Sequence, residues 1–396
     1  MWKRALTLVV VSWCASARGE EISFERALEC AQHSAAVTHL NTAAATTARA
    51  TTRSMRNEGP LEVSLWGGQR IAPATETGFE WAASLSQQLN YGTAYSARQR
   101  ALTAEAEWMR AEASKVARLR RLEAGLGWAT LRSAESRVAY AKQDVDAAER
   151  IVELTSKLVT AREVTRADLA TAKLGVADAK TAYLRAEGYL FEARQRLAGV
   201  LGSCENRDLH TAGDEPDMAV HKPLPPMQHP VIIARSAEAR AERARAETTE
   251  AAAQRIRATV DARRDAIGET VVGLSLSIPF WNPSGSRDAA RQFATAAQRQ
   301  SDEALQKEAI ATELALAIHE VEHTEEVFRV VASDALPAAE LALSSREKQL
   351  AVGEGTVIEL STSQRQLAAT RQAVAEAFGD KLRASIRLGL MFGAEP

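Results

Sequence analysis

One helical signature occurs twice in this chain, at positions 191 residues apart (356 minus 165). In the first copy, Thr165 and Asp168 match a capping box, and apolar residues then recur at every seventh position: Leu169, Val176, Tyr183, Leu190 and Leu197. In the second copy, Thr356 and Glu359 precede Leu360, Leu367, Val374 and Leu388, and Lys381 interrupts the series. Seven-residue spacing keeps an apolar seam on one face of a supercoiled helix. The chain is therefore predicted to be a tandem duplication of coiled-coil helices.

A very long helix is predicted before the first of these signatures. From Ala94 to about Thr160 there is no Pro, and Gly occurs only at Gly125 and Gly127. Apolar residues again step by seven, at Leu131, Val138, Val145, Val152 and Val159. A helix of about 65 residues is about 100 Å long, so it needs neighbours of similar length. We therefore expect the chain to form an oligomer.

Composition narrows the function classes. The 396 residues include 25% charged and only 5% aromatic residues, with a net charge of −2. This balance argues against a nucleic-acid partner, and the low aromatic content argues against a large conventional globular core. The sequence has no Gly-x-Ser-x-Gly elbow, no His-Glu-x-x-His and no phosphate loop, so we expect neither an enzyme nor a bound cofactor.

The N-terminus is predicted to direct export. Residues 1–17 combine the basic Lys3 and Arg4, a short apolar run and the small-residue site Ala15-Ser16-Ala17, as in a cleaved signal peptide. Cys14 offers a lipoprotein alternative, although Trp13 stands where a lipobox needs a small residue. No later segment approaches about 20 consecutive apolar residues, so we expect no transmembrane helix, and any membrane span should consist of strands.

Four segments alternate with a period of two, as strands do. The first contains Leu61, Val63 and Leu65, the second runs from Phe79 to Tyr91, the third spans 257–263, and the fourth runs from Val272 to Phe280. Aromatic residues flank the apolar face of the second segment, as in strands that face lipid. The alternative is a half-buried strand of a water-soluble sheet. The predicted lipid-facing residues are Phe79, Trp81, Leu85, Leu89, Val260, Val272, Leu274, Leu276 and Ile278.

The same order of elements is predicted twice: helix, hairpin, long helix, capped turn, helix. The expected first helices are Ser34 to about Arg56 and Pro230 to about Arg255, and Pro337 predicts a kink in the second long helix, about Arg287 to Ala351. The expected domains are a signal peptide (1–17), a first repeat (18–202), a Pro-rich connector (203–229) and a second repeat (230–392).

This order resembles the TolC family of outer-membrane efflux proteins, particularly its CzcC/CusC-like outer-membrane factors. The resemblance is carried by Gln228-His229-Pro230 at the start of the second repeat, by residues 274–280 (LSLSIPF), and by Gly353-Glu354-Gly355-Thr356 with Glu359-Leu360 at the second turn. The chain departs from the family pattern in having Ser34-Ala35 in place of Asn-Pro, and in lacking Gly at 162–164.

The resemblance implies a mainly α fold with a small β part. Duplicated long helices would form a coiled-coil tunnel, and four strands per protomer would contribute to a twelve-stranded outer-membrane barrel closed by a homotrimer. It implies an exit duct of a tripartite efflux pump in the cell outer membrane, reaching into the periplasm, with an adaptor protein and an inner-membrane pump as partners. A type I protein secretion duct and a periplasmic coiled-coil protein without a channel remain alternatives.

The same resemblance places adaptor docking and the narrow end of the tunnel at the two helix turns. The residues concerned are Glu163, Val164, Thr165, Asp168, Gly353, Glu354, Gly355, Thr356 and Glu359. Three copies of their four carboxylates would form a cation-favouring ring. Alternatively, Asp168 and Glu359 only close capping boxes. Gly353 and Gly355 can adopt positive φ, whereas Arg162 and Val164 stand at the equivalent places and the β-branched Val164 strongly resists it, so we expect the two turns to differ in shape.

Two further hypotheses concern side-chain pairs. In the implied architecture Cys30 and Cys204 meet halfway along the tunnel, in an oxidising compartment, which suggests a disulfide. His319 and His323 have a spacing that can bind a metal on one helix face, but they lack a third ligand nearby in sequence, so solvated surface residues are the simpler interpretation and we predict no metal site.

Overall fold

The computed structural model describes most of the chain. The described residues are 20–53, 58–70, 78–89, 93–204, 209–216, 218, 223–252, 256–265, 268–278 and 283–393. The predicted signal peptide, Cys14, Tyr91 and Phe280 lie outside them. The chain divides into two compact units. The first unit holds the described parts of Met1–Ser34, Ala117–Leu224 and Thr312–Pro396, and the second holds those of Ala35–Val116 and Pro225–Ala311.

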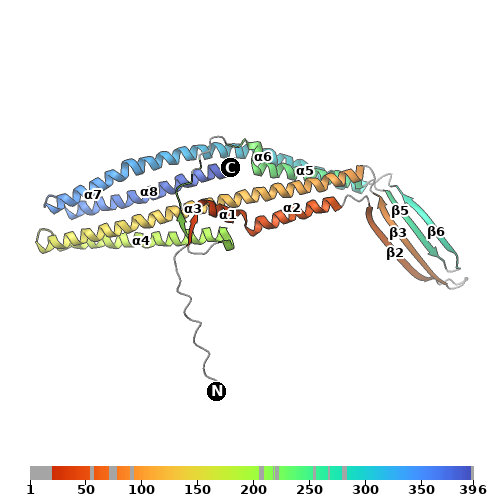
Figure 1. The fold of residues 1–396 in the computed structure, drawn as a ribbon, viewed down its shortest axis with the longest axis horizontal. Coiled ribbons are helices and arrows are strands. Elements are labelled where there is room, and N and C mark those ends of the chain that lie inside the picture. Colours follow the sequence, from red (N-terminus) through yellow and green to blue (C-terminus); the bar gives the residue numbers. More distant parts are fainter. Residues whose placement is uncertain are drawn as a thin grey trace, which may run out of the picture. The chain divides into compact units, whose positions relative to one another are not determined.

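Helices make up most of the structure, which confirms the prediction of a mainly α fold with a small β part (Figure 1). The first-half helices are α1 (Phe24–Gln32), α2 (Ala35–Arg53), α3 (Thr93–Thr160) and α4 (Arg166–Leu201). The second-half helices are α5 (Pro230–Ala252), α6 (Pro283–Arg329), α7 (Leu336–Ala351) and α8 (Val357–Phe392). Short 3-10 helices cover Gly202–Cys204 and Pro226–Gln228.

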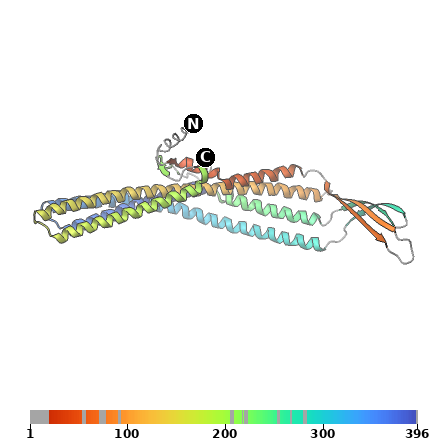
Figure 2. The same cartoon turned by 90° about the horizontal axis from the view of Figure 1, so that it is seen from below.

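In the first unit, α4 lies beside the part of α3 that belongs to this unit, with Gly127 against Leu197, and α7 contacts α8 (Figure 2). The predicted seam of α4 is only half-buried at Val176, Tyr183 and Leu190. The fully buried residues of this helix are mostly small, at Ala172, Gly175, Ala186 and Ala193. The three alanines occupy the second apolar position of their heptads, and Gly175 directly precedes the seam residue Val176. Small side chains at these places let the helices approach closely. Leu360, Leu367 and Val374 of α8 are buried on their predicted seam.

Pro337 lies in the first turn of α7, directly after a π-helical segment, Val330–Ala335. Proline has no N–H to donate to the preceding helical turn, and a π-helical segment is one known way to absorb such a break. The sequence predicts a disturbance at this position but not its form. Lys381, which interrupts the apolar series, forms an ion pair with Glu215 at 3.4 Å and lies over the ring of Phe328.

The first unit has its largest core around Trp128, whose side chain is fully buried. The Trp128 indole N–H donates to the Ile22 carbonyl oxygen at 3.1 Å, and Phe24 meets the Trp128 ring edge-on. Gly125 packs closely beside this core. A Cβ at Gly125 would stand only 2.9 Å from the side chains of Ile386 and Leu390, so a larger residue would not fit without rearrangement.

A small parallel sheet of the first unit joins the start of the described chain to the connector. It pairs β1 (Glu20–Ser23) with β4 (Leu209–Ala212). Neither strand is predicted from the sequence, because a segment of four residues is too short to show a period.

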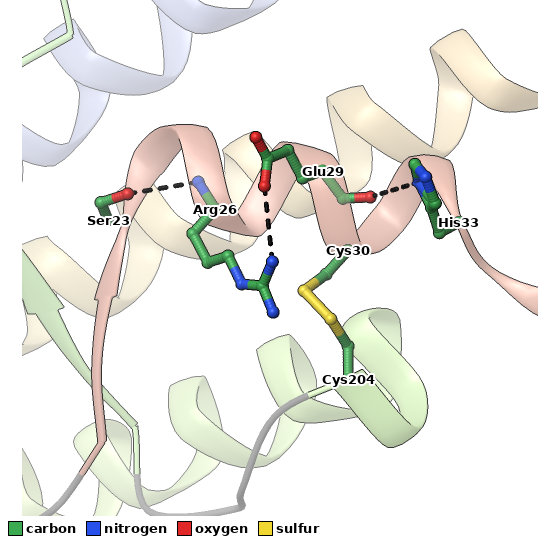
Figure 3. Close-up of a disulfide and its surroundings, with 6 residues drawn as sticks. All are labelled: Ser23, Arg26, Glu29, Cys30, His33 and Cys204. Atoms are coloured by element: carbon green, nitrogen blue, oxygen red, sulfur yellow. Dashed lines mark hydrogen bonds and ion pairs between the residues drawn. A yellow bond between two sulfur atoms is a disulfide. The ribbon is translucent and has the colours of Figure 1, made fainter.

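A disulfide joins Cys30 of α1 to Cys204, with a Cα–Cα distance of 5.8 Å (Figure 3). Near it, the Ser23 hydroxyl caps α1 by accepting from the Arg26 N–H, and Arg26 pairs with Glu29.

The second unit contains an antiparallel sheet with the strand order β2-β3-β5-β6. Its strands are β2 (Glu58–Arg70), β3 (Gly78–Leu89), β5 (Ile256–Arg264) and β6 (Thr270–Ser277). These strands lie at the four segments that alternate in sequence. Among the described residues, no helix is both long enough and apolar enough to cross a bilayer.

Candidate functional site

The two helix turns have the same backbone hydrogen bonds. In the first turn, the N–H groups of Arg162 and Glu163 donate to the carbonyl oxygens of Val159 and Leu158, at 3.0 and 2.9 Å. In the second turn, those of Gly353 and Glu354 donate to Leu350 and Gln349, at 3.1 and 2.9 Å. Each residue of the second turn lies 191 positions after its counterpart. The turns are therefore structural equivalents.

This equivalence overturns the prediction that the turns differ in shape. In each turn the first of the three turn residues (162–164 and 353–355) has a left-handed backbone. Its φ is 62° at Arg162 and 78° at Gly353. Val164 and Gly355 are outside the left-handed region, so the β-branched side chain of Val164 is not strained there. Gly355 is close to other atoms instead, because a Cβ on it would stand 3.1 Å from the Leu350 backbone nitrogen.

Both turns end in complete capping boxes. The Thr165 hydroxyl accepts from the Asp168 N–H at 3.2 Å, and the Thr165 N–H donates to the Asp168 carboxylate at 2.9 Å. Thr356 and Glu359 make the same two bonds, each at 3.2 Å. The hydrogen bonds that Thr165 donates to the Asp168 carboxylate lower the pKa of Asp168 from its usual 3.8, with the hydroxyl bond contributing more than the backbone bond. Asp168 and Glu359 thus serve as caps.

The other two carboxylates of the turns are solvent-exposed. Glu163 and Glu354 both stand at the tips of their turns. Beneath the tips lies a small buried core that includes Ile151, Leu350 and Leu360. The core fixes the helix ends, so the exposed carboxylates are carried by a rigid base. Such an arrangement can attract cations or dock a polar partner surface, and it brings together no groups that suggest catalysis.

Two adjacent rows at the centre of the sheet show how it separates apolar from polar side chains. Val63, Leu85, Val260 and Leu274 pair across all four strands, and the next row is Ser64, Ser84, Asp261 and Gly273. Because adjacent residues of a strand point to opposite faces, the first row lies on one face and the second on the other.

Seven of the nine predicted lipid-facing residues share the apolar face. Of the other two, Leu89 pairs with Ile256 at the end of β3, and Ile278 directly follows β6. The seven are Phe79, Trp81, Leu85, Val260, Val272, Leu274 and Leu276. Several are strongly exposed in the protomer, Leu274 by 80% and Val272 by 71%. An exposed, contiguous apolar face of this kind marks a membrane or protein contact.

Hydrogen bonds link side chains across the polar face. The hydroxyls of Ser64 and Ser84 are 2.7 Å apart, and Ser86 donates to Glu62. The Asp261 carboxylate lies over Gly273, where a Cβ would stand 2.8 Å from Oδ1. This face is suited to contact with water.

His319 and His323 lie next to each other on α6. Their rings stack with centroids 6.1 Å apart. Within the described ranges, no three or more His, Cys, Asp or Glu side chains gather as metal ligands would.

Comparisons with known proteins place the fold. No protein-family model and no curated protein sequence matches the chain. Among solved structures, CusC, described for its folding and transmembrane channel formation, has 14% sequence identity and a TM-score of 0.78, with 97% of this chain and 96% of CusC covered. This chain has the fold of an outer-membrane channel protein.

Two further structures share this channel fold over nearly the whole chain. A membrane protein from Pseudomonas aeruginosa has 16% identity and a TM-score of 0.78, with 99% of this chain and 97% of that one covered. The outer membrane protein VceC from Vibrio cholerae has 14% identity and a TM-score of 0.72, with coverages of 94% and 97%. The resemblance inferred from the sequence is thus confirmed at the level of the fold.

Sequence reasoning missed the special role of Arg162 in the first turn. The signal was available, because Arg162 aligns with Gly353 when the repeats are superposed at an offset of 191. Glycine at one copy of a repeated position indicates a left-handed backbone at the other.

Proposed function

We propose that this protein is the outer-membrane exit duct of a tripartite efflux pump, through which substrates pass from an inner-membrane transporter and its adaptor to the outside. The observation that carries the proposal is the sheet, with an exposed apolar face and a hydrogen-bonded polar face. Set in a bilayer, the apolar face would contact lipid and the polar face would line water. The fold shared with outer-membrane channels supports the same function.

Several copies are needed to complete such a duct. β2 and β6 are the two ends of the described sheet, and each has one strand neighbour within it. An open strand edge cannot face lipid, because its N–H and C=O groups would lack hydrogen-bond partners. We propose that three copies pair β6 of one protomer with β2 of the next, giving twelve strands. The same homotrimer would supply neighbours for the long helices.

The helix turns are proposed as the periplasmic end, where an adaptor docks. Glu163 and Glu354 are exposed, and the core beneath them fixes the helix ends. In a trimer they would contribute six carboxylates to one mouth, which favours the passage of cations. Such a duct performs no chemistry, so the choice of substrate would belong to the pump.

Two measurements together test the function. The full-length protein should fractionate with the outer membrane as a trimer, and in planar bilayers it should open discrete, cation-preferring single-channel currents. Glu163→Gln with Glu354→Gln should reduce the cation preference without changing the fractionation. Recovery as a water-soluble protein without channel activity would instead support the periplasmic coiled-coil alternative. A strain lacking the protein should then show whether small-molecule export or protein secretion is lost.

A further inference from the structure

The first unit contains a pocket of about 120 Å³ whose lining is rich in arginine. It lies between one face of α3, one face of α4 and a single residue of α8, Arg383. Ala134 and Ala193 are buried where α3 and α4 meet. Their short side chains leave the space open, and the longer side chains of Arg137, Arg196 and Arg383 surround it.

The pocket lining carries an excess of positive charge. Three guanidinium groups line it against one carboxylate, that of Glu192. Arg137 pairs with Glu376 at 3.1 Å, Arg196 with Glu192 at 3.3 Å, and Arg383 with Asp380. The three carboxylate partners have side-chain exposures of 46%, 59% and 56%. Exposed ion pairs are weak, so a ligand anion can compete for the guanidinium groups.

Arg137 packs against Tyr189, another residue of the pocket lining. Its guanidinium lies over the ring of Tyr189, 5.9 Å from the centroid. Its Nε is buried and has no hydrogen-bond partner within the described part of the chain. A buried donor without a partner is costly, and a bound acceptor would remove that cost.

Arg383 is brought to the pocket by a close contact between α3 and α8. The Ser133 hydroxyl donates to the Ala375 carbonyl oxygen at 2.9 Å. At Gly379 a Cβ would stand only 2.5 Å from that hydroxyl, so glycine permits the approach. The third guanidinium is thus placed by helix packing and not by a mobile loop.

We propose that this pocket binds a small tetrahedral oxyanion, of the class to which phosphate and sulfate belong. Planar guanidinium groups bind such anions through paired N–H donors, and three of them from three helices would surround one anion. A bound anion would tie α3, α4 and α8 together. The site goes beyond the proposed duct function, because it does not depend on conduction or on the adaptor.

Isothermal titration of the full-length, detergent-purified protein with inorganic phosphate tests the proposal. Sodium chloride is adjusted to hold the ionic strength constant, so that general charge screening does not change. We expect saturable binding of one phosphate per protomer. Arg137→Gln and Arg383→Gln should each weaken it at least tenfold. Arg387→Gln is the matched control, because Arg387 lies on the same helix, pairs with Glu320 and does not line the pocket.

Arg196→Gln is a third variant, chosen because its loss of binding could not be explained by misfolding. The Arg196 side chain is 76% exposed, so its replacement should leave the fold intact, and it should still weaken phosphate binding. Circular dichroism checks the helix content of every variant. Absence of saturable binding to the wild type would overturn the proposal. Equal binding by Arg196→Gln, Arg387→Gln and the wild type would overturn it as well.

Discussion

Arg162 and Gly353 occupy equivalent positions in the two helix turns, and both have a left-handed backbone, with φ of 62° and 78°. Glycine adopts this conformation freely, whereas a residue with a Cβ is strained by about 1 to 2 kcal/mol. The protein therefore has two turns of the same shape at different conformational cost. Strain of this kind is retained only where the surrounding structure fixes the backbone.

Exchanging these residues should change stability in opposite directions. We expect Gly353→Ala to lower the free energy of unfolding by about 1 kcal/mol, because it introduces the strain. Arg162→Gly should be neutral or raise it by up to about 1 kcal/mol, since the relief of strain is partly offset by the greater freedom of glycine in the unfolded chain. Thermal unfolding of both variants measures this. A loss from Arg162→Gly as large as that from Gly353→Ala would contradict the strain argument.

The second turn should be the more sensitive to bulk at its third residue. A Cβ at Gly355 would stand 3.1 Å from the Leu350 backbone nitrogen, whereas Val164 already occupies the equivalent place in the first turn. We expect Gly355→Val to reduce export and adaptor cross-linking while leaving trimer assembly and membrane insertion intact. Val164→Gly is the matched control and should change little. Full export by Gly355→Val together with loss of export by Val164→Gly would show that the adaptor does not dock at the second turn.

The two faces of the sheet should differ in their tolerance of charge. Leu276 pairs with Ala258 on the apolar face, and its neighbour Ser275 pairs with Thr259 on the polar face. An arginine facing lipid at the bilayer midplane costs about 2 to 4 kcal/mol, so Leu276→Arg should reduce the amount of trimer in the outer-membrane fraction. Ser275→Arg should be tolerated. Leu85→Arg and Ser86→Arg repeat the comparison on β3. Equal assembly of Leu276→Arg and Ser275→Arg would show that the faces are assigned wrongly.

The capping box at Thr165 should make a small pH-dependent contribution to stability. Hydrogen bonds from Thr165 lower the pKa of Asp168 from its usual 3.8. Because the folded pKa is below the unfolded one, the contribution is present above about pH 4 and is lost as the pH falls through the folded pKa. Asp168→Asn should therefore lower the Tm at pH 7 but have little effect near pH 3. Thr165→Ala, which removes the donor hydroxyl, should show the same pH dependence. A Tm difference that is equal at both pH values would rule out this linkage.

The bond between Cys30 and Cys204 should stabilise the protein strongly, because it closes a loop with a sequence separation of 174 residues. Removing a native disulfide typically costs about 2 to 5 kcal/mol, so Cys30→Ser should lower the free energy of unfolding by that order. Thiol titration checks the bond itself. The unfolded, unreduced chain without residues 1–17 should show no free thiols, and the same chain after reduction should show two. Two free thiols before reduction would exclude the bond.

The sequence determined the element types because their periods are strong over long segments. Seven-residue spacing predicted α3, α4 and α8, and alternation predicted the four strands and the face that carries most of their apolar residues. The capping boxes were also predicted from local sequence, since each requires only a hydroxyl residue and an acidic residue three positions later. These features depend on neighbours within a few residues, and such neighbours are visible in a sequence.

Only the tertiary structure decided how the turns are built and what the small residues do. The left-handed residue is Arg162, although its side chain gives no preference for that backbone, because the helix pairs and the core beneath fix the path of the chain. The buried alanines of α4 contribute little to an apolar pattern, yet they let the neighbouring helices approach closely. Ala193 of α4, together with Ala134 of α3, also leaves the arginine-lined pocket open. These properties depend on contacts between residues far apart in the chain, and no local period records them.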